Sequence, residues 1–456
     1  MSEHKILSRQ ACLFLVLVIF LNTAYTLNRF SEVSADSARP AFHQHKVNHD
    51  IQYNYLGRTA DIISECQQKM APKVCYGPEQ IRNAYNIKSL PGQNITGKGR
   101  TIVISSAFQS PQLRHDLATF DTLFNLPSTP LTIVAPQGVP DWDPNNKTQA
   151  IWSAETALDV EWAHVIAPDA GIVVVEGKSD NDNDMVAALQ YAVDKNLGDV
   201  ISMSFGEGEN CPKPAWSQAW HAVLSAATQK NMTLIAASGD SGAAQTSCDD
   251  KSWQKMVSTP ASDPLVTSVG GTTLNADPVT GAYHSETAWN DATTQSASGG
   301  GFSSAILRPS YQVEAALPDA GRGVPDVAYN SSMDHGVLCI WSDGPGGSNG
   351  VYLFGGTSAG APQWAAIAIL ADQAANKRLG SINPLIYKIG KNPLLYQFAF
   401  HDIVSGNNTV NLSATSKSPQ TVQGYEARPG WDAATGWGSP NAGILVPLLA
   451  KLANAK

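Results

Sequence analysis

The sequence predicts an α/β fold of three layers, in which a mainly parallel central sheet is flanked by helices. Short apolar runs rich in β-branched residues predict six strands, at 101–105, 131–135, 171–176, 200–205, 233–237 and 265–269. Helical patterns fall between and after them, at 150–166, 184–195, 214–230 and 358–375. Apolar strands that alternate with helices are typical of a parallel sheet covered on both faces. Functional side chains in such sheets lie at the carboxyl ends of the strands.

Composition and charge narrow the class of protein. The chain has 456 residues, of which 43% are hydrophobic and 15% charged, and this balance fits a folded globular protein. Its formal net charge is -9. An acidic chain of this kind argues against nucleic acid as a partner.

The first residues have the pattern of an export signal. Lys5 and Arg9 precede an apolar run at 11–21, which is shorter than the roughly 20 residues of a membrane span but suits a signal peptide. We therefore interpret 1–29 as a signal peptide, or as an N-terminal anchor if it is not cleaved. The protein is expected to be secreted, with membrane contact only in the anchored case.

The remaining chain divides into an arm and one large domain. Residues 30–72 are polar and weakly periodic, which predicts a linker or loosely ordered arm. Regular structure is expected from near Tyr76, within a domain at 73–456 whose last part, 380–456, is expected to be rich in loops.

Four cysteines suggest two disulfides. In an exported protein Cys66–Cys75 and Cys211–Cys248 are plausible pairs, although unpaired buried thiols remain an alternative. Cys339 stands alone. The sequence contains no CxxC pair or Cys/His cluster that would indicate a zinc site.

Ser358 is the candidate nucleophile. It lies in the string F-G-G-T-S-A-G-A-P at 354–362, which precedes an apolar helix. At a helix N-terminus, free N–H groups favour the negative charge that develops when a serine attacks a carbonyl. The alternative is a serine that only caps the helix. No His-Gly-Thr stretch supplies a histidine base, and a fitting context is missing for His115, His164, His221, His284, His335 and His401.

Two acids on the helix predicted at 150–166 are candidates for the base. Glu155 and Asp159 are four residues apart and therefore lie on one helix face. If they are buried together, they share a proton, and the ionised member accepts the serine proton. The alternative is an ordinary solvated acidic face.

Asp240 follows the strand predicted at 233–237, in the turn S-G-D-S-G. A protonated aspartate can donate a hydrogen bond to an oxyanion, which requires a buried site or an acidic medium. The alternative is a turn aspartate that caps its own backbone.

Together these strings resemble the sedolisin family, the serine-carboxyl peptidases, from about Tyr76 to the C-terminus. Supporting segments are found at 75–85, 298–301, 309–312 and 324–327. The resemblance implies a subtilisin-like fold and an acid-active endopeptidase that cleaves proteins and peptides, and we expect a monomer. It also implies that Ser358 is the nucleophile, Glu155 the base, Asp159 its support and Asp240 the oxyanion donor.

The resemblance further implies one calcium ion near the C-terminus. Asp402 and Asp432 would bind it through carboxylates, and Ile403, Arg428 and Gly430 through backbone carbonyls, with water completing a set of oxygen ligands that suits Ca²⁺. Arg428 stands where the family usually has glycine. The alternative is a pair of loop aspartates without metal.

The sequence departs from the family pattern at one more position, and it leaves two alternative functions open. Phe205 occupies a position where many relatives have tryptophan, and phenylalanine offers no hydrogen-bond donor. The first alternative function is a catalytically silent family member that binds peptides. The second is a histidine-dependent serine hydrolase.

Overall fold

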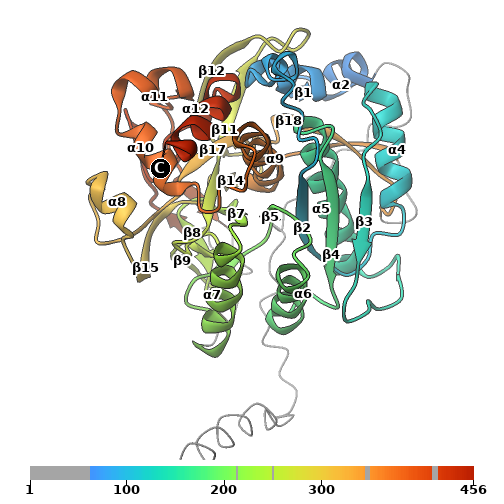
Figure 1. Ribbon diagram of the computed structural model, residues 1–456, viewed down its shortest axis with the longest axis horizontal. Helices are drawn as coiled ribbons and strands as arrows, with labels where there is room; N and C mark the ends of the chain where they lie inside the picture. The colour runs from blue at the N-terminus through green and yellow to red at the C-terminus, as the bar shows by residue number, and fades with distance from the viewer. Residues whose placement is uncertain (1–61, 212–213, 249–250, 345–349, 413–419, 456) are drawn as a thin grey trace, which may run out of the picture. The chain divides into compact units, whose positions relative to one another are not determined.

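An eight-stranded sheet forms the middle layer of the fold (Figure 1). Its strand order is β12-β11-β7-β5-β2-β4-β3, and β17 pairs with β11. Every pair in this sheet is parallel except β11 with β12. The strands are β2 (Thr101–Ala107), β3 (Leu131–Val134), β4 (Gly171–Gly177), β5 (Val200–Met203), β7 (Thr233–Ala237), β11 (Thr267–Ala276), β12 (Tyr283–Ala288) and β17 (Val327–Asn330). The predicted mainly parallel sheet is therefore confirmed.

The structure is a computed structural model that describes residues 62–211, 214–248, 251–344, 350–412 and 420–455. All of these residues belong to one compact unit. The segment interpreted as a signal or anchor, and the arm as far as residue 61, lie outside the described residues.

Helices cover both faces of the sheet, which completes the three predicted layers (Figure 1). One face carries α5 (Lys147–Ile166) and α9 (Thr357–Ala375), with α12 (Ala442–Asn454) packed on α9. The other face carries α6 (Asp182–Asp194) and α7 (Pro214–Gln229). Side chains of β2 alternate between two cores, because successive residues of a strand point to opposite faces.

The helices α5 and α9 are enclosed on almost every side. Both pack against the sheet and against each other, and nearly all of their residues are buried. Asn146 begins α5 by accepting hydrogen bonds from the N–H groups of Thr148 (3.0 Å) and Gln149 (3.2 Å). Gly356 begins α9 with a φ of 90°, which glycine adopts without strain. The polar side chains of these helices are therefore largely shielded from water.

Helices that the sequence analysis did not predict lie near both ends of the described chain. Regular structure begins before Tyr76, because α2 (Ile62–Met70) lies within the predicted arm. In the C-terminal part, the expected loops alternate with α10 (Asn383–Gly390), α11 (Pro393–Ala399) and α12. The helix α4 (Leu113–Phe124) was not predicted either. Most of these helices are short, so that tertiary packing stabilises them more than their own sequence pattern does.

Smaller elements surround the sheet. A three-stranded sheet of β1 (Val74–Tyr76), β18 (His335–Trp341) and β19 (Gly350–Phe354) leads into α9. The other helices are α3 (Pro78–Ala84), α8 (Ser310–Glu314) and two 3₁₀ turns, Ile87–Ser89 and Pro91–Gln93. The other strands are β6 (Glu207–Gly208), β8 (Ala244–Thr246), β9 (Trp253–Lys255), β10 (Ser258–Thr259), β13 (Asn290–Asp291), β14 (Ser296–Ala297), β15 (Gly301–Leu307), β16 (Gly321–Val324), β20 (Phe400–His401), β21 (Val410–Leu412), β22 (Gln420–Val422) and β23 (Ser439–Pro440).

Both predicted disulfides are present. Cys66 is bonded to Cys75, which ties α2 to β1, and Cys211 is bonded to Cys248. Cys339 is a free thiol buried in β18. In the described part of the chain, every helix is too short or too polar to cross a bilayer.

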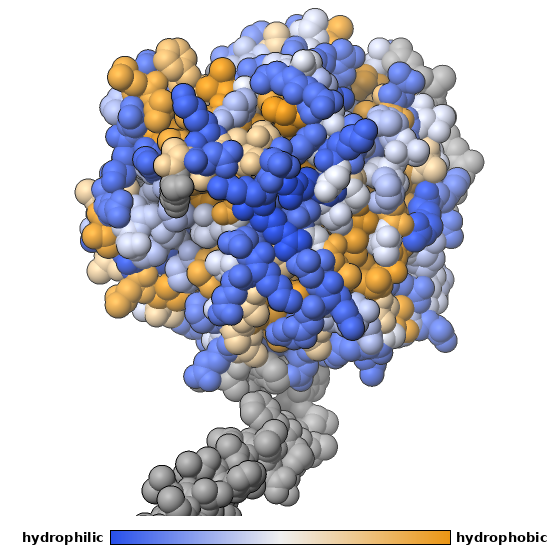
Figure 2. All heavy atoms as spheres, viewed as in Figure 1, coloured by the Kyte–Doolittle hydropathy of each residue, from blue (hydrophilic) through white to orange (hydrophobic). Residues whose placement is uncertain are grey.

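The surface is mixed in polarity. Figure 2 shows hydrophilic side chains over the middle of the viewed face and an apolar area at the upper left, where Figure 1 places α11. Leu394 and Phe398 of α11 are among the large apolar side chains that remain exposed.

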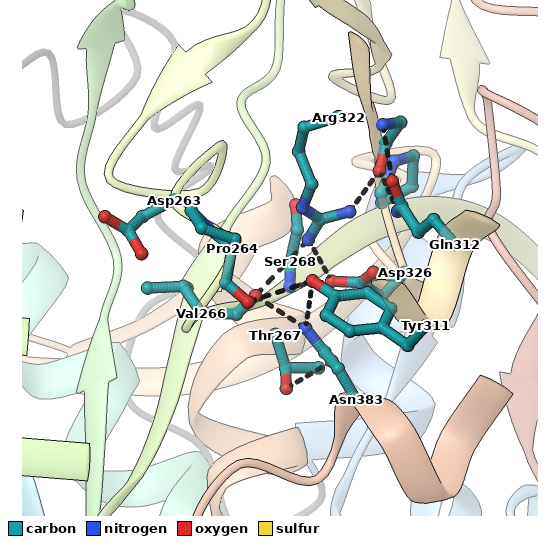
Figure 3. Close-up of polar contacts among 12 residues, drawn as sticks. Asp263, Pro264, Val266, Thr267, Ser268, Tyr311, Gln312, Arg322, Asp326 and Asn383 are labelled. Carbon is teal, nitrogen blue, oxygen red and sulfur yellow. Dashed lines mark hydrogen bonds and ion pairs between the residues drawn. The ribbon is translucent and has the colours of Figure 1, made fainter. Parts of the chain in front are cut away.

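A buried ion pair joins the sheet to the C-terminal helices (Figure 3). The guanidinium of Arg322 contacts the Oδ2 atom of Asp326 at 2.5 Å, and neither side chain is exposed. Oδ2 also accepts the N–H of Ser268 (2.8 Å), and Oδ1 accepts the hydroxyl of Tyr387 (2.8 Å). Asp326 is therefore held from β16, β11 and α10 at once. Its backbone carbonyl accepts the N–H of Trp437 (2.9 Å), which attaches the C-terminal loop to the same point.

We predict that Arg322→Met lowers the free energy of unfolding by about 3–5 kcal/mol, because it leaves the Asp326 carboxylate buried without its partner. Lys391→Met is the control: it breaks the solvent-exposed pair with Glu314 and should cost about 1 kcal/mol or less. Urea unfolding followed by circular dichroism measures both changes. Equal effects of the two substitutions would contradict this description of the network.

Candidate active site

Glu155 and Asp159 lie one turn apart on α5, and both are buried, with exposed fractions of 2% and 1%. Burial raises the pKa of Asp159 to about 8. Burial also raises the pKa of Glu155 well above its usual range, and repulsion from Asp159 raises it further. The two carboxyl groups therefore retain a proton well above the pH at which a solvated carboxyl loses it.

The two acids differ in their hydrogen-bond partners. Oδ1 of Asp159 accepts a hydrogen bond from the Ser204 hydroxyl at 2.7 Å, which lowers the pKa of Asp159. Among the described residues, no group has hydrogen-bonding geometry to either carboxyl oxygen of Glu155. The Ser358 hydroxyl is nevertheless close enough to lower the pKa of Glu155. Glu155 is thus the member of the pair that faces the serine.

Ser358 is the second residue of α9, and it is buried, with an exposed fraction of 3%. The packing of α9 against α5 brings it to the carboxylate pair. Its backbone N–H has no acceptor among the residues that the structure describes. An unpaired N–H at a helix N-terminus can stabilise negative charge beside the serine.

Asp240 lies in the turn after β7 and directs its carboxylate to the start of α9. Oδ1 accepts two hydrogen bonds from Thr357, one from its N–H (2.8 Å) and one from its hydroxyl (2.7 Å). Asp240 also interacts electrostatically with Glu155 and raises the pKa of that group. Its own exposed fraction is 7%.

The Asp240 turn is held by a neighbouring loop. Gly239, with a φ of 109°, accepts the N–H of Gly299 at its carbonyl (2.7 Å). The carbonyl of Asp240 accepts the N–H of Ala297 (2.8 Å). A Cβ atom at position 299 would collide with the backbone of Ser238, so only glycine allows this approach.

The structure therefore brings all four predicted residues, Ser358, Glu155, Asp159 and Asp240, into one buried cluster. It contradicts the alternatives that the sequence left open for Glu155, Asp159 and Ser358. The acids of α5 do not form a solvated face, the N-cap of α9 is Gly356 instead of Ser358, and the Asp240 carboxylate binds Thr357. No hydrogen bond joins Ser358 to a histidine in the described part of the chain. The catalytic roles of the four residues stay predictions.

Three further residues complete the cluster, and sequence reasoning did not predict their contacts with the acids. Ser204 binds Asp159, Thr357 binds Asp240, and Gly356 provides space, because a Cβ atom there would collide with Oδ2 of Asp240. Two of them, Gly356 and Thr357, belong to the string G-T-S that singled out Ser358. That string was therefore the sequence signal from which they could have been found. Ser204 follows the end of β5, and nothing in the sequence pairs it with α5.

Phe205 lies beside this cluster in an aromatic contact. Its ring centroid is 6.0 Å from that of Trp152 on α5 and 5.8 Å from that of Trp220 on α7. The residue packs instead of donating a hydrogen bond. The polar contact behind the pair in this chain comes from Ser204.

The residues predicted to bind calcium lie in two neighbouring loops. Asp402 accepts the N–H of Gly430 at both carboxylate oxygens (3.1 and 3.2 Å). Asp432 is buried and accepts the N–H groups of Arg428 (3.1 Å) and Ala434 (2.8 Å). In the described ranges, no group of three or more His, Cys, Asp or Glu residues is placed to hold a metal ion.

The predicted set contains only two carboxylates, and its other members are backbone carbonyls. Among the described residues, no donor binds the carbonyl oxygens of Ile403, Arg428 or Gly430. Arg428 does not have a positive φ, so its backbone conformation does not require glycine. The donor chemistry, two carboxylates with three unpaired carbonyls, thus fits a hard cation.

Comparison with known proteins identifies the family. The sequence profile of the subtilase family matches residues 145–389, more than half of the chain. Kumamolisin from Bacillus sp. (strain MN-32) is 31% identical over 397 residues, which cover 84% of this chain and 65% of kumamolisin. The solved structure of Pseudomonas sedolisin, a serine-carboxyl proteinase complexed with two molecules of pseudo-iodotyrostatin, superposes with a TM-score of 0.68 at 26% identity and covers 84% of this chain and 98% of that one.

The chain belongs to the subtilase family, and within it to the sedolisins. The sedolisin match also confirms the subtilisin-like fold. A further relative, tripeptidyl-peptidase 1 from Dictyostelium discoideum, is 28% identical over 392 residues, which cover 81% of this chain and 58% of that protein. The chain spans between 58% and 65% of the length of these curated relatives.

We predict that the free energy of unfolding decreases as pH rises from about 4 to about 8. Asp159 has a pKa of about 8 in the folded state, whereas an unfolded aspartate titrates near 3.9. The stabilisation from its raised pKa is complete below the unfolded value and is lost as pH rises through the folded value, at least about 1 kcal/mol in all. Urea unfolding at several pH values measures it, with Asp159→Asn as the control that should flatten the dependence. A stability that rises over this range, or an unchanged slope in the variant, would contradict the shift.

Proposed function

We propose that this chain is an exported, acid-active serine-carboxyl endopeptidase. The observation that carries the proposal is the single buried cluster in which Ser358 faces Glu155, Asp159 lies behind Glu155, and Asp240 meets the start of the nucleophile helix. Membership of the sedolisins supports the reaction class.

In this mechanism Glu155 accepts the proton of the Ser358 hydroxyl while Oγ attacks the carbonyl carbon of a peptide bond. The resulting oxyanion receives hydrogen bonds from the Ser358 N–H and from protonated Asp240. Glu155 then gives its proton to the leaving amine, and an acyl-enzyme remains on Ser358. Water attacks the acyl group in the same way and regenerates the serine. Asp159 shares the remaining proton of the pair and holds Glu155 in position.

Two protonation requirements set the pH range in which this mechanism operates. A carboxylate base operates only while one member of the Glu155–Asp159 pair is ionised. Asp240 donates to the oxyanion only while it is protonated. A histidine base behaves differently, since it loses its function below a pKa of about 6.5.

Two features support the finer parts of the proposal. Disulfides Cys66–Cys75 and Cys211–Cys248 are typical of an oxidising, extracytoplasmic compartment, which agrees with export. The oxygen donors of Asp402, Ile403, Arg428, Gly430 and Asp432 would hold one Ca²⁺. When bound, this ion supplies positive charge that orders the C-terminal loops.

We predict that Ser358→Ala and Glu155→Gln each lower peptide hydrolysis in acid by at least about a thousandfold, because the nucleophile or its base is lost. Glu161→Gln is the matched control. Glu161 is another buried glutamate of α5, but it accepts the N–H of Ile340 in β18 instead of facing Ser358. Digestion of a denatured protein between about pH 2 and pH 8, with the products sized by mass spectrometry, measures activity.

The same assay separates the alternatives. Products of mixed length indicate an endopeptidase, whereas successive tripeptides would indicate the activity that the name of tripeptidyl-peptidase 1 describes. An optimum above neutrality would favour a histidine-dependent hydrolase. Absence of any cleavage, with peptide binding retained, would favour a silent member of the family. Activity that survives Ser358→Ala would refute the proposed nucleophile.

We predict that chelation of calcium lowers the melting temperature by several degrees, since an ion that binds only the folded state stabilises it by mass action. The double variant Asp402→Asn/Asp432→Asn should melt at the lower temperature and show no response to chelator or to added calcium. Calorimetry measures melting, and elemental analysis measures bound metal. An unchanged melting curve together with no bound calcium would count against the site.

A further inference from the structure

We propose that Thr357 is a positioning residue that keeps the proton of Asp240 on the Oδ2 atom, from which it is donated to the oxyanion. The inference rests on the proposed function and extends it from the four predicted residues to the hydroxyl that orients one of them. Thr357 is fully buried and directly precedes the nucleophile.

The hydrogen bonds around Thr357 determine where its hydroxyl hydrogen points. Oγ1 of Thr357 accepts the N–H of Gly239 at 3.1 Å. A hydroxyl carries one hydrogen, and here that hydrogen remains available for Oδ1 of Asp240 at 2.7 Å. The hydroxyl therefore accepts from the Asp240 turn and donates to the Asp240 carboxyl group. It ties the turn and the carboxyl group to the same point of α9.

Oδ1 of Asp240 consequently receives two donors from one residue. The N–H of Thr357 lies 2.8 Å from it, in addition to the hydroxyl. An oxygen that accepts two hydrogen bonds is the carbonyl-like oxygen of a carboxylic acid, since a third hydrogen on it would face two others. The proton of the neutral acid is therefore placed on Oδ2.

Oδ2 lies at the turn that carries the nucleophile. It packs against Gly356, where a Cβ atom would collide with it, and Gly356 is separated from Ser358 only by Thr357. The N–H of Ser358 has no acceptor among the described residues. Both oxyanion donors, the Oδ2 proton and this N–H, are thus located at the turn that begins α9.

Two acids of the site, Asp240 and Asp159, each accept a hydrogen bond from a hydroxyl, and this parallel makes the inference testable. Thr357 donates to Asp240, and Ser204 donates to Asp159. A donor to a carboxyl oxygen favours the ionised form, so that removal of the donor favours the protonated form. The titratable group that faces Asp240 from the neighbouring helix is Glu155, with Asp159 behind it on α5.

The experiment compares pH–rate profiles of the wild type with Thr357→Val, which keeps the shape of the side chain and the backbone N–H but removes the hydroxyl. We expect kcat to fall at least about tenfold with little change in KM, because the oxyanion donor is no longer fixed. The alkaline limb of the profile, which reports loss of the Asp240 proton, should move up by about one pH unit. Thr357→Ser, which retains the hydroxyl, should restore both values.

Two further variants separate this role from a structural one. Thr272→Val removes a similar buried hydrogen bond, from Thr272 to Glu286 (2.6 Å), outside the site. It should lower stability and move neither limb. Ser204→Ala should move the acid limb upward and leave the alkaline limb in place, because it acts on the Glu155–Asp159 pair.

A readout without turnover keeps the proposal testable if activity is low. Infrared difference spectra recorded against pH show the C=O band of protonated Asp240, which Asp240→Asn identifies by its absence. Its midpoint should rise by about one pH unit in Thr357→Val and stay unchanged in Thr272→Val. Thr357→Ala serves in the same measurement if the valine variant does not fold.

An Asp240 band and an alkaline limb that both stay at their wild-type positions in Thr357→Val would overturn the inference. If Ser358→Ala abolishes activity in that case, the proposed function stands without it. If no peptide is cleaved but the band moves as expected, the proton is placed as proposed and the proposed function fails instead.

Discussion

The candidate active site is built around one energetically unfavourable arrangement, the burial of two carboxyl groups one helical turn apart. Glu155 and Asp159 lose their hydration on α5 and repel each other if both ionise. Retention of a proton between them relieves this repulsion. The other residues of the site surround this pair. Ser204 donates a hydrogen bond to Asp159, Ser358 faces Glu155, and Asp240 is a third acid close to Glu155.

The fold explains how such a cluster is held. Because α5 and α9 are enclosed by the sheet and by outer helices, their polar residues are shielded from water. The turn after β7 then brings Asp240 to the first residue of α9, and the loop at 297–299 supports that turn from outside. Each catalytic candidate therefore comes from a rigid element or from a turn fixed by hydrogen bonds, which is the arrangement that preorganised catalysis requires.

Much of this arrangement was predictable from the sequence because it follows from local patterns. The β-branched runs gave the parallel sheet, and the spacing of Glu155 and Asp159 placed them on one face. Local patterns do not reveal contacts between residues that are far apart in sequence. Ser204 and Asp159 are 45 residues apart in sequence, and their contact arises only when β5 meets α5. The short C-terminal helices were missed because their packing on α9 and on each other, more than their own propensity, makes them form. The bonds between Thr357 and Asp240 depend on the conformation of two turns that sequence alone does not fix.

The central claim is that Glu155 and Asp159 titrate as one unit. Carbon NMR of protein labelled at the aspartate and glutamate carboxyl groups tests it directly, with Glu155→Gln and Asp159→Asn used to assign the two signals. The account predicts that the pair keeps one proton into the neutral range, and that removal of either acid shifts the titration of the other. Two signals that titrate independently near about 4, as solvated carboxyls do, would contradict it.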